Sequence, residues 1–393
     1  MHAARLERLR SYAPPVVVLT HPDSLCYFVG FQTPGGSLSA AVVQGDAITI
    51  VVRDLEARHV VPVDGCTLTV RTYAEDDPAL LLAALLLALP SQGRASVGYE
   101  AQCPRMTAAA RQRLCAATPP DVAWTDVSFA IRRQRAIKEE SELGCIRRAA
   151  GFVEAALENA PPHAFAGAPE TLVAARLAFA KAAAGSEWTA YPDFVSAGPR
   201  GCVAHKPAEY GARVPAEGLV FVEVGASHGR YHAARMHTEF VGRPPPWYAP
   251  LERALRRAVR EGAAAARPGA AARDVDARMR RIVAEAAEAR GAPPLTMHRR
   301  SGYSIGLGND VDWADGVMRL DPTSADVLEA GAALHLIPWI CVEGHGSMGF
   351  SDVVVVADAP YSLFTGETPS RCLQGRRRRR RAARRTARGA PAD

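Results

Sequence analysis

The sequence predicts a mixed α/β protein with a small N-terminal domain, a larger second domain and a charged tail. Its 393 residues are enough for two domains, each with its own core. Short β-branched runs alternate with helical patterns over roughly residues 1–128, which is typical of a small α/β domain. From about residue 366, arginines and small residues cannot bury enough apolar surface to offset the entropy of ordering. We therefore expect domains at 1–128 and 129–365, followed by a disordered tail at 366–393.

Local patterns assign the elements of the N-terminal domain. The longest apolar run, Ala79 to Pro90, has about a dozen residues, whereas a membrane span needs roughly 20. We therefore expect a buried helix there, capped by acidic residues at its start and stopped by Pro90. The predicted strands are 16–19, 47–52 and 95–98, and the predicted helices are 79–89 and 106–117.

The second domain begins with a long helical pattern of mixed charge, residues 131–160. A second helical stretch, residues 248–288, is broken by Pro268-Gly269. Continuous apolar runs predict buried strands at 219–224, 333–340 and 353–356.

The basic charge of the chain comes from its tail. Ten arginines and one acid give residues 368–393 a charge of +9, so the chain's +6 leaves −3 for residues 1–367. The charge is therefore no argument for a nucleic-acid enzyme. Six consecutive arginines can bind polyanions nonspecifically, but we favour a solvated terminal extension.

The eight cysteines are widely spread and form no C-x-x-C pair. We expect reduced or incidental thiols in a cytoplasmic protein. The N-terminus is charged and lacks the apolar core of a signal peptide, and we expect no membrane association.

One segment is more specific than the rest. Residues 302–307 read Gly-Tyr-Ser-Ile-Gly-Leu, and Asp312-Trp313-Ala314-Asp315 follows. This segment resembles the signature of the creatinase/aminopeptidase P superfamily, and residues 135–143 resemble its inter-domain segment. The resemblance covers roughly residues 1–365. It implies a creatinase-like N-terminal domain, a pita-bread catalytic domain and a homodimer.

The resemblance also allows the metal ligands of the family's dinuclear peptidases to be checked. Those enzymes need two Asp, one His and two Glu, because hard carboxylates neutralise two divalent cations. The matching positions here are Glu223, Ala234, Tyr303, Ile337 and either Ser351 or Asp352. Alanine and isoleucine cannot bind a metal, so we expect no metal and no cofactor. Tyrosine in place of histidine is similar to the metal-free branch, creatinase and ectoine hydrolase.

Four residues are predicted to be catalytic. His205 matches the histidine that moves the proton in creatinase-like members, and histidines ordinarily titrate near neutral pH. Glu223 follows an apolar run, where burial favours proton transfer; a salt bridge is the alternative. Tyr303 can donate to an oxyanion or simply fill the volume of a lost metal site. Asp315 stands where ectoine hydrolase carries a longer carboxylate.

Six further residues are predicted to bind substrate. His237 replaces an arginine of the metal-free relatives, with a structural role as the alternative. Trp313 and Phe31 are candidate apolar walls, and the resemblance implies that Phe31 reaches the partner's site in the dimer. The set is Phe31, Tyr231, His237, Trp313, His335 and Asp352.

These residues predict a metal-independent enzyme acting on a C–N bond of a small polar molecule, such as a cyclic amidine, a guanidino compound or an amino-acid derivative. A hydrolase is the first expectation. Departures from the relatives at Met236, His237 and Ala314 also fit a cyclase or lyase of specialised metabolism. Two alternatives remain: an Xaa-Pro metallopeptidase, and an inactive pita-bread binding protein.

Overall fold

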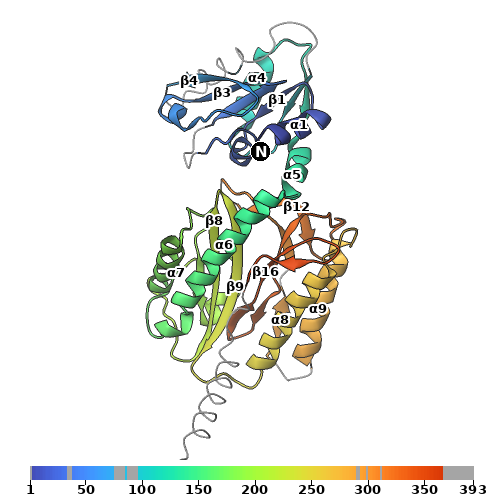
Figure 1. Cartoon of the computed structure of the whole chain (residues 1–393). Coiled ribbons are helices and arrows are strands. Elements are labelled where there is room, and N and C mark those ends of the chain that lie inside the picture. Colours follow the sequence, from blue (N-terminus) through green and yellow to red (C-terminus); the bar gives the residue numbers. More distant parts are fainter. Residues whose placement is uncertain are drawn as a thin grey trace, which may run out of the picture. The chain divides into compact units, whose positions relative to one another are not determined.

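The structure is a computed structural model that describes residues 2–32, 38–74, 85, 96–288, 293–297, 300–309 and 312–365. The chain forms two compact units (Figure 1), residues 1–136 with 307–317 and residues 137–306 with 318–393. The predicted tail lies outside the described residues, and so does the predicted helix at 79–89 apart from Leu85.

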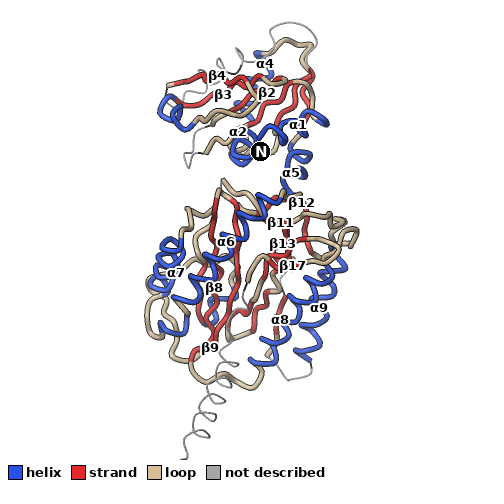
Figure 2. Tube along the Cα trace, in the orientation of Figure 1, coloured by secondary structure: helices blue, strands red, loops and turns tan. Residues whose placement is uncertain are grey.

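The first unit is built on a six-stranded mixed sheet of order β4-β3-β2-β1-β5-β6 (Figure 2). The predicted strands at 16–19 and 47–52 are confirmed as β1 and β3. Helix α4 begins two residues later than predicted because the Thr107 hydroxyl caps it, accepting from Ala110 N at 3.1 Å. The strands of this sheet are β1 (Val16–Leu19), β2 (Ala40–Gln44), β3 (Ala47–Arg53), β4 (Thr67–Tyr73), β5 (Ser96–Tyr99) and β6 (Ala123–Asp126). The described helices of the first unit are α1 (His2–Tyr12), α2 (Pro22–Val29), α4 (Ala108–Ala117) and α5 (Ser128–Ala136), with the 3₁₀ helix η1 (Asp54–His59).

The second unit combines three sheets with two pairs of helices. The sheet orders are β7-β8-β9, β10-β14-β15 and β12-β11-β13-β16-β17. Helix α6 lies against β8 and β9, and α8 packs beside α9 (Figure 1). Its helices are α6 (Glu140–Asn159), α7 (Glu170–Ala184), α8 (Tyr248–Ala265) and α9 (Ala272–Glu288), with the 3₁₀ helices η2 (Pro162–Phe165) and η3 (Gly198–Cys202). Its strands are β7 (Phe194–Ala197), β8 (Gly218–His228), β9 (Tyr231–Val241), β10 (Leu295–Met297), β11 (Gly302–Ile305), β12 (Ala314–Leu320), β13 (Ala333–Leu336), β14 (Trp339–Val342), β15 (Gly346–Gly349), β16 (Asp352–Val355) and β17 (Tyr361–Ser362).

Two predicted elements are wrong because each is broken in the middle. The helical stretch 131–160 is α5 and α6, separated where Lys138 N donates to Gly331 O at 3.0 Å and Ile137 pairs with Ala332. Helix α6 then restarts with Glu139 N donating to Glu142 Oε2 at 2.7 Å. The predicted strand 333–340 is β13 and β14, because Pro338 has no N–H to continue a ladder. The predicted strands at 219–224 and 353–356, and the helix break at Pro268-Gly269, are confirmed.

The β8–β9 hairpin positions the candidate site. Glu223 stands opposite Phe194 of β7 and Met236 of β9. Since side chains alternate along a strand, Phe221 and Glu223 share one face of β8 and Val222 lies on the other. Helix α6 packs on this hairpin, so the elements that carry the site are fixed by a buried interface.

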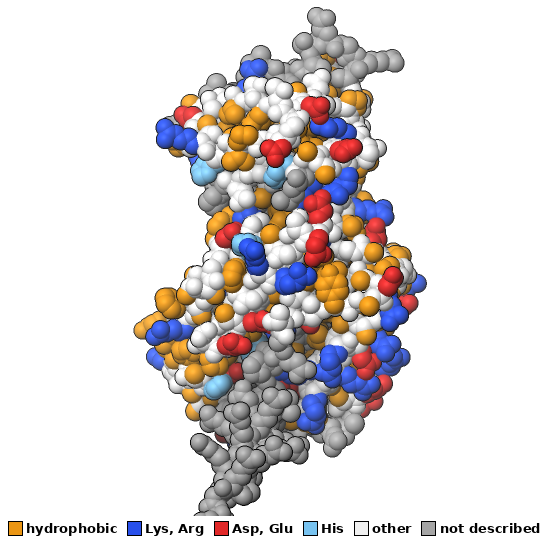
Figure 3. Space-filling view, viewed as in Figure 1, with side chains coloured by type: hydrophobic (Ala, Val, Ile, Leu, Met, Phe, Trp, Pro, Cys, Tyr) orange, Lys and Arg blue, Asp and Glu red, His pale blue; other side chains and the backbone are white. Residues whose placement is uncertain are grey.

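The surface of the described residues carries both signs of charge. Acidic and basic side chains are interspersed over the face in Figure 3. On α8 and α9, for example, Glu261 pairs with Arg257 at 2.6 Å and with Arg278 at 3.1 Å. None of the described helices combines the length and apolar composition that crossing a bilayer requires.

A buried ion pair joins α7 to Asp193, the residue directly before β7. Lys181 Nζ donates to Asp193 Oδ1 at 2.6 Å and to Gly225 O at 2.8 Å, and both side chains are buried. Burial raises the pKa of Asp193, and the Lys181 charge opposes this shift. The carboxylate therefore depends on its lysine partner to remain ionised inside the unit.

Lys181→Met should lower the free energy of unfolding by about 3 kcal/mol or more, because it leaves the Asp193 carboxylate buried without its cation. Urea denaturation measures this loss. Arg176→Met, on the exposed side of the same helix, is the matched control and should cost less than about 0.5 kcal/mol. Equal stability of the two variants would contradict the structural role given to the pair.

Candidate functional site

A cavity of about 90 Å³ lies within the second unit. It brings together three of the four predicted catalytic residues: His205, Glu223 and Tyr303. Most of the remaining lining is apolar. The other lining residues are Phe194, Ser196, Val203, Ala204, Lys206, Phe221, Met236, Arg300, Ile337 and Trp339. A small apolar chamber with a few polar groups is the usual form of a small-molecule site.

Glu223 is the buried carboxyl group of the cavity. Its side chain is 4 % exposed and comes from an apolar part of β8. Burial raises the pKa of Glu223 to about 7, and the nearby Arg300 charge opposes the shift. A carboxyl group with that pKa exchanges a proton readily near neutral pH, as a general acid or base must.

Tyr303 belongs to a buried hydrogen-bonded chain. Its Oη lies 3.0 Å from Nδ1 of His335, the residue opposite it on β13. Nε2 of His335 lies 2.8 Å from Ser351 Oγ. The Ser351 oxygen accepts a hydrogen bond from Met236 N at 2.6 Å. Burial lowers the pKa of His335 to about 3, so this imidazole is neutral. In the tautomer with its proton on Nδ1, His335 donates to the Tyr303 oxygen.

His205 lies on an exposed loop that follows η3. Its backbone φ of 54° is in the left-handed region, which few non-glycine residues adopt. The imidazole stacks on Phe194 of β7, with ring centroids 5.3 Å apart, and lies 6.2 Å from the Tyr191 ring. The ring is therefore oriented by aromatic contacts while the loop leaves it open to solvent.

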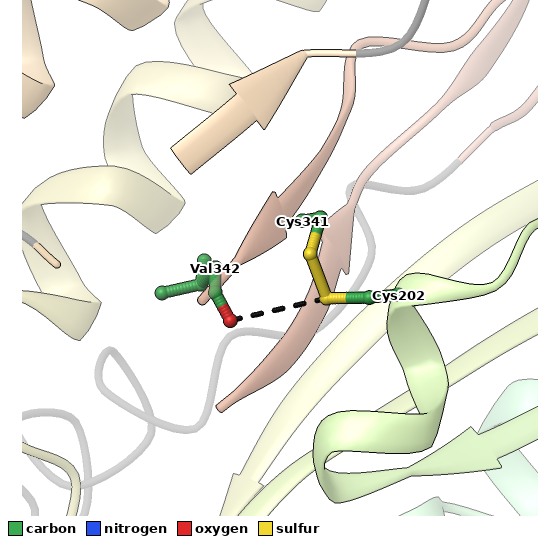
Figure 4. The surroundings of a disulfide bond; sticks show 3 residues. All are labelled: Cys202, Cys341 and Val342. Carbon is green, nitrogen blue, oxygen red and sulfur yellow. Dashed lines mark hydrogen bonds between the residues drawn. A yellow bond between two sulfur atoms is a disulfide. The ribbon is translucent and has the colours of Figure 1, made fainter. Parts of the chain in front are cut away.

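A disulfide between Cys202 and Cys341 fastens the start of this loop (Figure 4). Cys202 ends η3, three residues before His205, and Cys341 lies in β14, two residues after Trp339 of the cavity. The expectation of reduced, buried or incidental thiols is therefore wrong for this pair. The packing of η3 on β14 brings the two Cα atoms to 4.9 Å, although 139 residues separate them in sequence. The pair also removes one of the arguments for a cytoplasmic location.

The dashed line in Figure 4 joins Cys202 Sγ to Val342 O over 3.9 Å. A disulfide sulfur carries no hydrogen, so this contact becomes a hydrogen bond only when Cys202 is a thiol. Ion pairs hold the same region: Arg200 donates to both carboxylate oxygens of Glu170, at 2.7 and 2.6 Å. Beneath the segment, a Cβ at Gly346 would collide with the Gly198 carbonyl, so β15 can approach η3 only with glycine there.

Arg300 and Lys206 are cavity residues that the sequence reasoning did not single out. The Arg300 guanidinium lies 4.5 Å from the centroid of the Tyr303 ring. Lys206 forms an ion pair with Glu209 on the same loop. Arg300 lies three residues before Tyr303, and Lys206 directly follows His205. This nearness in sequence to two predicted catalytic residues could have indicated them. Neither position belongs to the metal-ligand pattern, which is why that pattern missed them.

None of the six predicted substrate-binding residues is among those that line the cavity. Tyr231 Oη donates to Glu142 Oε1 at 2.6 Å, against α6. His237 Nε2 lies 3.0 Å from Glu239 Oε1, in a cluster with His163. Interactions with both histidines outweigh burial and lower the pKa of Glu239 to about 2. These contacts tie Tyr231 and His237 to neighbouring side chains, and their predicted role in substrate binding stays a prediction.

Ser351 and Asp352 differ in their contacts, although both line a hollow with Arg235 that is separate from the cavity. Ser351 Oγ lies 2.8 Å from His335 Nε2 and accepts from Met236 N, which connects it to Tyr303 of the cavity. Asp352 accepts from Ser362 Oγ at 2.7 Å. These contacts favour Ser351 for the fifth ligand position, and the prediction that Asp352 binds substrate stays a prediction.

Phe31, Trp313 and the beginning of β12 with Asp315 belong to the first unit, and none of the three residues is among those that line the cavity. Phe31 is 1 % exposed and Trp313 is 2 % exposed, so neither offers free surface to a substrate. Asp315 interacts electrostatically with Arg135, whose guanidinium also bonds Asp23 at 2.7 Å. The catalytic prediction for Asp315 stays a prediction, with a structural interaction as its observed role.

Comparison with known proteins identifies the family. Residues 144–358 match the model of metallopeptidase family M24, and residues 6–137 match the creatinase/prolidase N-terminal domain. The first match spans more than half of the chain. The chain belongs to metallopeptidase family M24. The expected membership of the creatinase/aminopeptidase P superfamily is confirmed, and so is the α/β fold with a creatinase-like N-terminal domain and a pita-bread domain.

Individual relatives of this M24 protein agree with that assignment. The uncharacterized hydrolase/peptidase y4tM of Sinorhizobium fredii is 24 % identical over 89 % of this chain and 91 % of its own length. The probable dipeptidase PepE of Mycobacterium tuberculosis is 32 % identical over 60 % of this chain and 59 % of its own. The X-Pro aminopeptidase structure from Thermotoga maritima superposes with a TM-score of 0.78 at 17 % identity, covering 94 % of this chain and 98 % of that one.

The ligand positions of this M24 chain do not fit a dinuclear metal site. Glu223, Tyr303 and Ile337 line the cavity, and Ala234 pairs with Gly225, two residues from Glu223. These positions and Ser351 supply one carboxylate, and no described group of three or more His, Cys, Asp or Glu residues is arranged to hold a metal ion. One carboxylate beside an arginine cannot neutralise two divalent cations.

Glu223→Gln should flatten the dependence of stability on pH. Because the pKa of about 7 in the folded state exceeds the ordinary glutamate value of 4.5, the folded state holds the proton more tightly. That stabilisation is complete below pH 4.5 and is lost as pH rises to about 7, a loss of about 3 kcal/mol. Urea titrations from pH 4.5 to 8 measure it. The exposed Glu217→Gln is the control; parallel curves for wild type and Glu223→Gln would refute the assignment.

Replacing Cys202 and Cys341 with serine should lower the free energy of unfolding by about 2–4 kcal/mol, because the disulfide closes a long loop. Urea denaturation of the double variant measures the loss. Cys115→Ser, which removes a half-buried free thiol, is the control and should have a much smaller effect. Alkylation of both thiols in unreduced, denatured protein would show that the bond is not formed.

Proposed function

We propose that this chain is a metal-independent hydrolase that cleaves a C–N bond of a small polar substrate. One observation carries the proposal: His205, Glu223 and Tyr303 line one cavity at which the family's metal-ligand positions hold alanine, isoleucine and serine. The fold has a cavity at this position, and His205, Glu223 and Tyr303 bring proton-transfer and hydrogen-bonding groups to it.

The chemistry follows from the three side chains. His205 takes a proton from water as the water oxygen attacks the carbon of the C–N bond. Tyr303 donates its O–H to the oxygen that becomes negative, where a preorganised donor is most effective. Protonated Glu223 gives its proton to the leaving nitrogen as the C–N bond breaks. Both acid–base groups regain their starting protonation by exchange with solvent, so one water is consumed and one C–N bond is replaced by a C–O bond.

The comparisons support hydrolysis of such a bond. Relatives of this chain are named as dipeptidases, and ectoine hydrolase of Halomonas elongata is 29 % identical over 37 % of this chain. The likeness to dipeptidases favours an amide as the scissile group, while the missing ligands favour a mechanism without the metal. The departures at Met236 and Ala314 set this chain apart from the ectoine hydrolase pattern and support a different substrate.

His205→Ala should reduce kcat at least 100-fold, since general acid–base groups contribute about 10²–10⁴ in rate. The assay is hydrolysis of a library of dipeptides and N-acyl amino acids by protein purified in chelator. Tyr210→Ala, on the same exposed loop, is the control and should keep near wild-type activity.

Metal analysis separates this proposal from a metallopeptidase. The expected result is activity that survives exhaustive chelation, with less than one equivalent of Mn, Co or Zn per chain. Two equivalents of metal that restore activity after chelation would establish the metallopeptidase instead. Full activity of His205→Ala would show that the mechanism is wrong even if the protein is metal-free.

A further inference from the structure

Arg300 is a half-buried cation that enters the cavity beside the proposed catalytic groups. Its guanidinium lies over the Tyr303 ring, 4.5 Å from the centroid. Among the described residues, its interactions are with this ring and, electrostatically, with Glu223 and His335. None of the ion pairs of the described residues includes it, although taking a cation partly out of water favours an anionic partner.

Among the described residues, no carboxylate forms an ion pair with Arg300, and Glu223 of the same cavity is no exception. Lys206, the other cation of the cavity, already has Glu209 as its partner. The cavity therefore presents one cation without a carboxylate partner in the described residues.

The remaining walls indicate what accompanies an anion. Phe221, Met236, Ile337 and Trp339 are buried and apolar, and the cavity holds only about 90 Å³. The planar guanidinium matches the two oxygens of a carboxylate, which it can bind with two parallel hydrogen bonds. The contact with the Tyr303 ring places this cation beside the proposed hydrogen-bond donor of the site.

We propose that Arg300 is the specificity-determining residue of the site and binds the carboxylate of a small N-acyl amino acid or dipeptide. The scissile amide then lies between His205 and Glu223, with its carbonyl oxygen toward Tyr303. This inference rests on the proposed hydrolase function and adds the substrate class: small carboxylates, in preference to their neutral amides.

Binding tests the proposal without depending on turnover. Isothermal titration calorimetry would compare N-acetyl derivatives of glycine, alanine, proline and leucine with the corresponding neutral N-acetyl amino acid amides, using His205→Ala to prevent hydrolysis. At least one acid should bind tenfold or more tightly than its amide. Combining Arg300→Gln with His205→Ala should remove this preference. The affinity for the amide should stay within threefold of that of His205→Ala alone. Arg300→Lys should retain part of the preference, because it keeps the charge without the planar fork.

Lys206→Gln is the matched control, since it removes one positive charge from the same cavity. It should change the acid-to-amide preference less than threefold. The proposal is overturned if no acid is preferred, if the preference survives Arg300→Gln, or if Lys206→Gln abolishes it equally. Melting temperatures of the ligand-free variants establish that each is folded.

Failure of the hydrolase proposal has a different signature. Wild-type protein would then bind the acids through Arg300 but release no amine from them. Conversely, hydrolysis of acids and neutral amides with equal kcat/KM, unchanged in Arg300→Gln, would leave the hydrolase proposal intact and reject the role of Arg300.

Discussion

The burial of one carboxyl group, Glu223, is the constraint on which the rest of the site depends. An ionised carboxylate in an apolar strand is costly unless a cation or hydrogen bonds stabilise it. The family uses metal ions for that purpose, and this chain has alanine, tyrosine, isoleucine and serine at the other ligand positions. Burial instead raises the pKa of Glu223 to about 7. The proposed hydrolase uses this carboxyl group as its acid.

The groups around Glu223 are consistent with this conversion. Tyr303, His335 and Ser351 satisfy one another by hydrogen bonds that end on the backbone of Met236. This series of hydrogen bonds fixes the Tyr303 phenol without introducing a net charge, because burial keeps the His335 imidazole neutral. Arg300 adds a positive charge next to the Tyr303 ring. A fixed organic cation offers directional hydrogen bonds to a carboxylate, whereas a metal ion polarises a bound water.

His205 depends on a different kind of support. Its loop has little regular structure, so the ring is positioned by stacking on Phe194 and by anchors that precede it in the chain. The Cys202–Cys341 bond and the Arg200–Glu170 pair fix the beginning of the loop to β14 and α7. These anchors also explain how a residue with a φ of 54° is held in a conformation that costs free energy.

The sequence by itself determined the family, the α/β class, strands such as β1 and β8, and the loss of metal ligands at Ala234 and Ile337. These follow from local patterns and side-chain chemistry, which need no knowledge of distant contacts. Only the tertiary structure decided the breaks near Ile137 and Pro338, the disulfide across 139 residues, and the placement of Arg300 beside Glu223. Those features arise where segments far apart in the chain pack together, and periodicity within one segment carries no information about its partner.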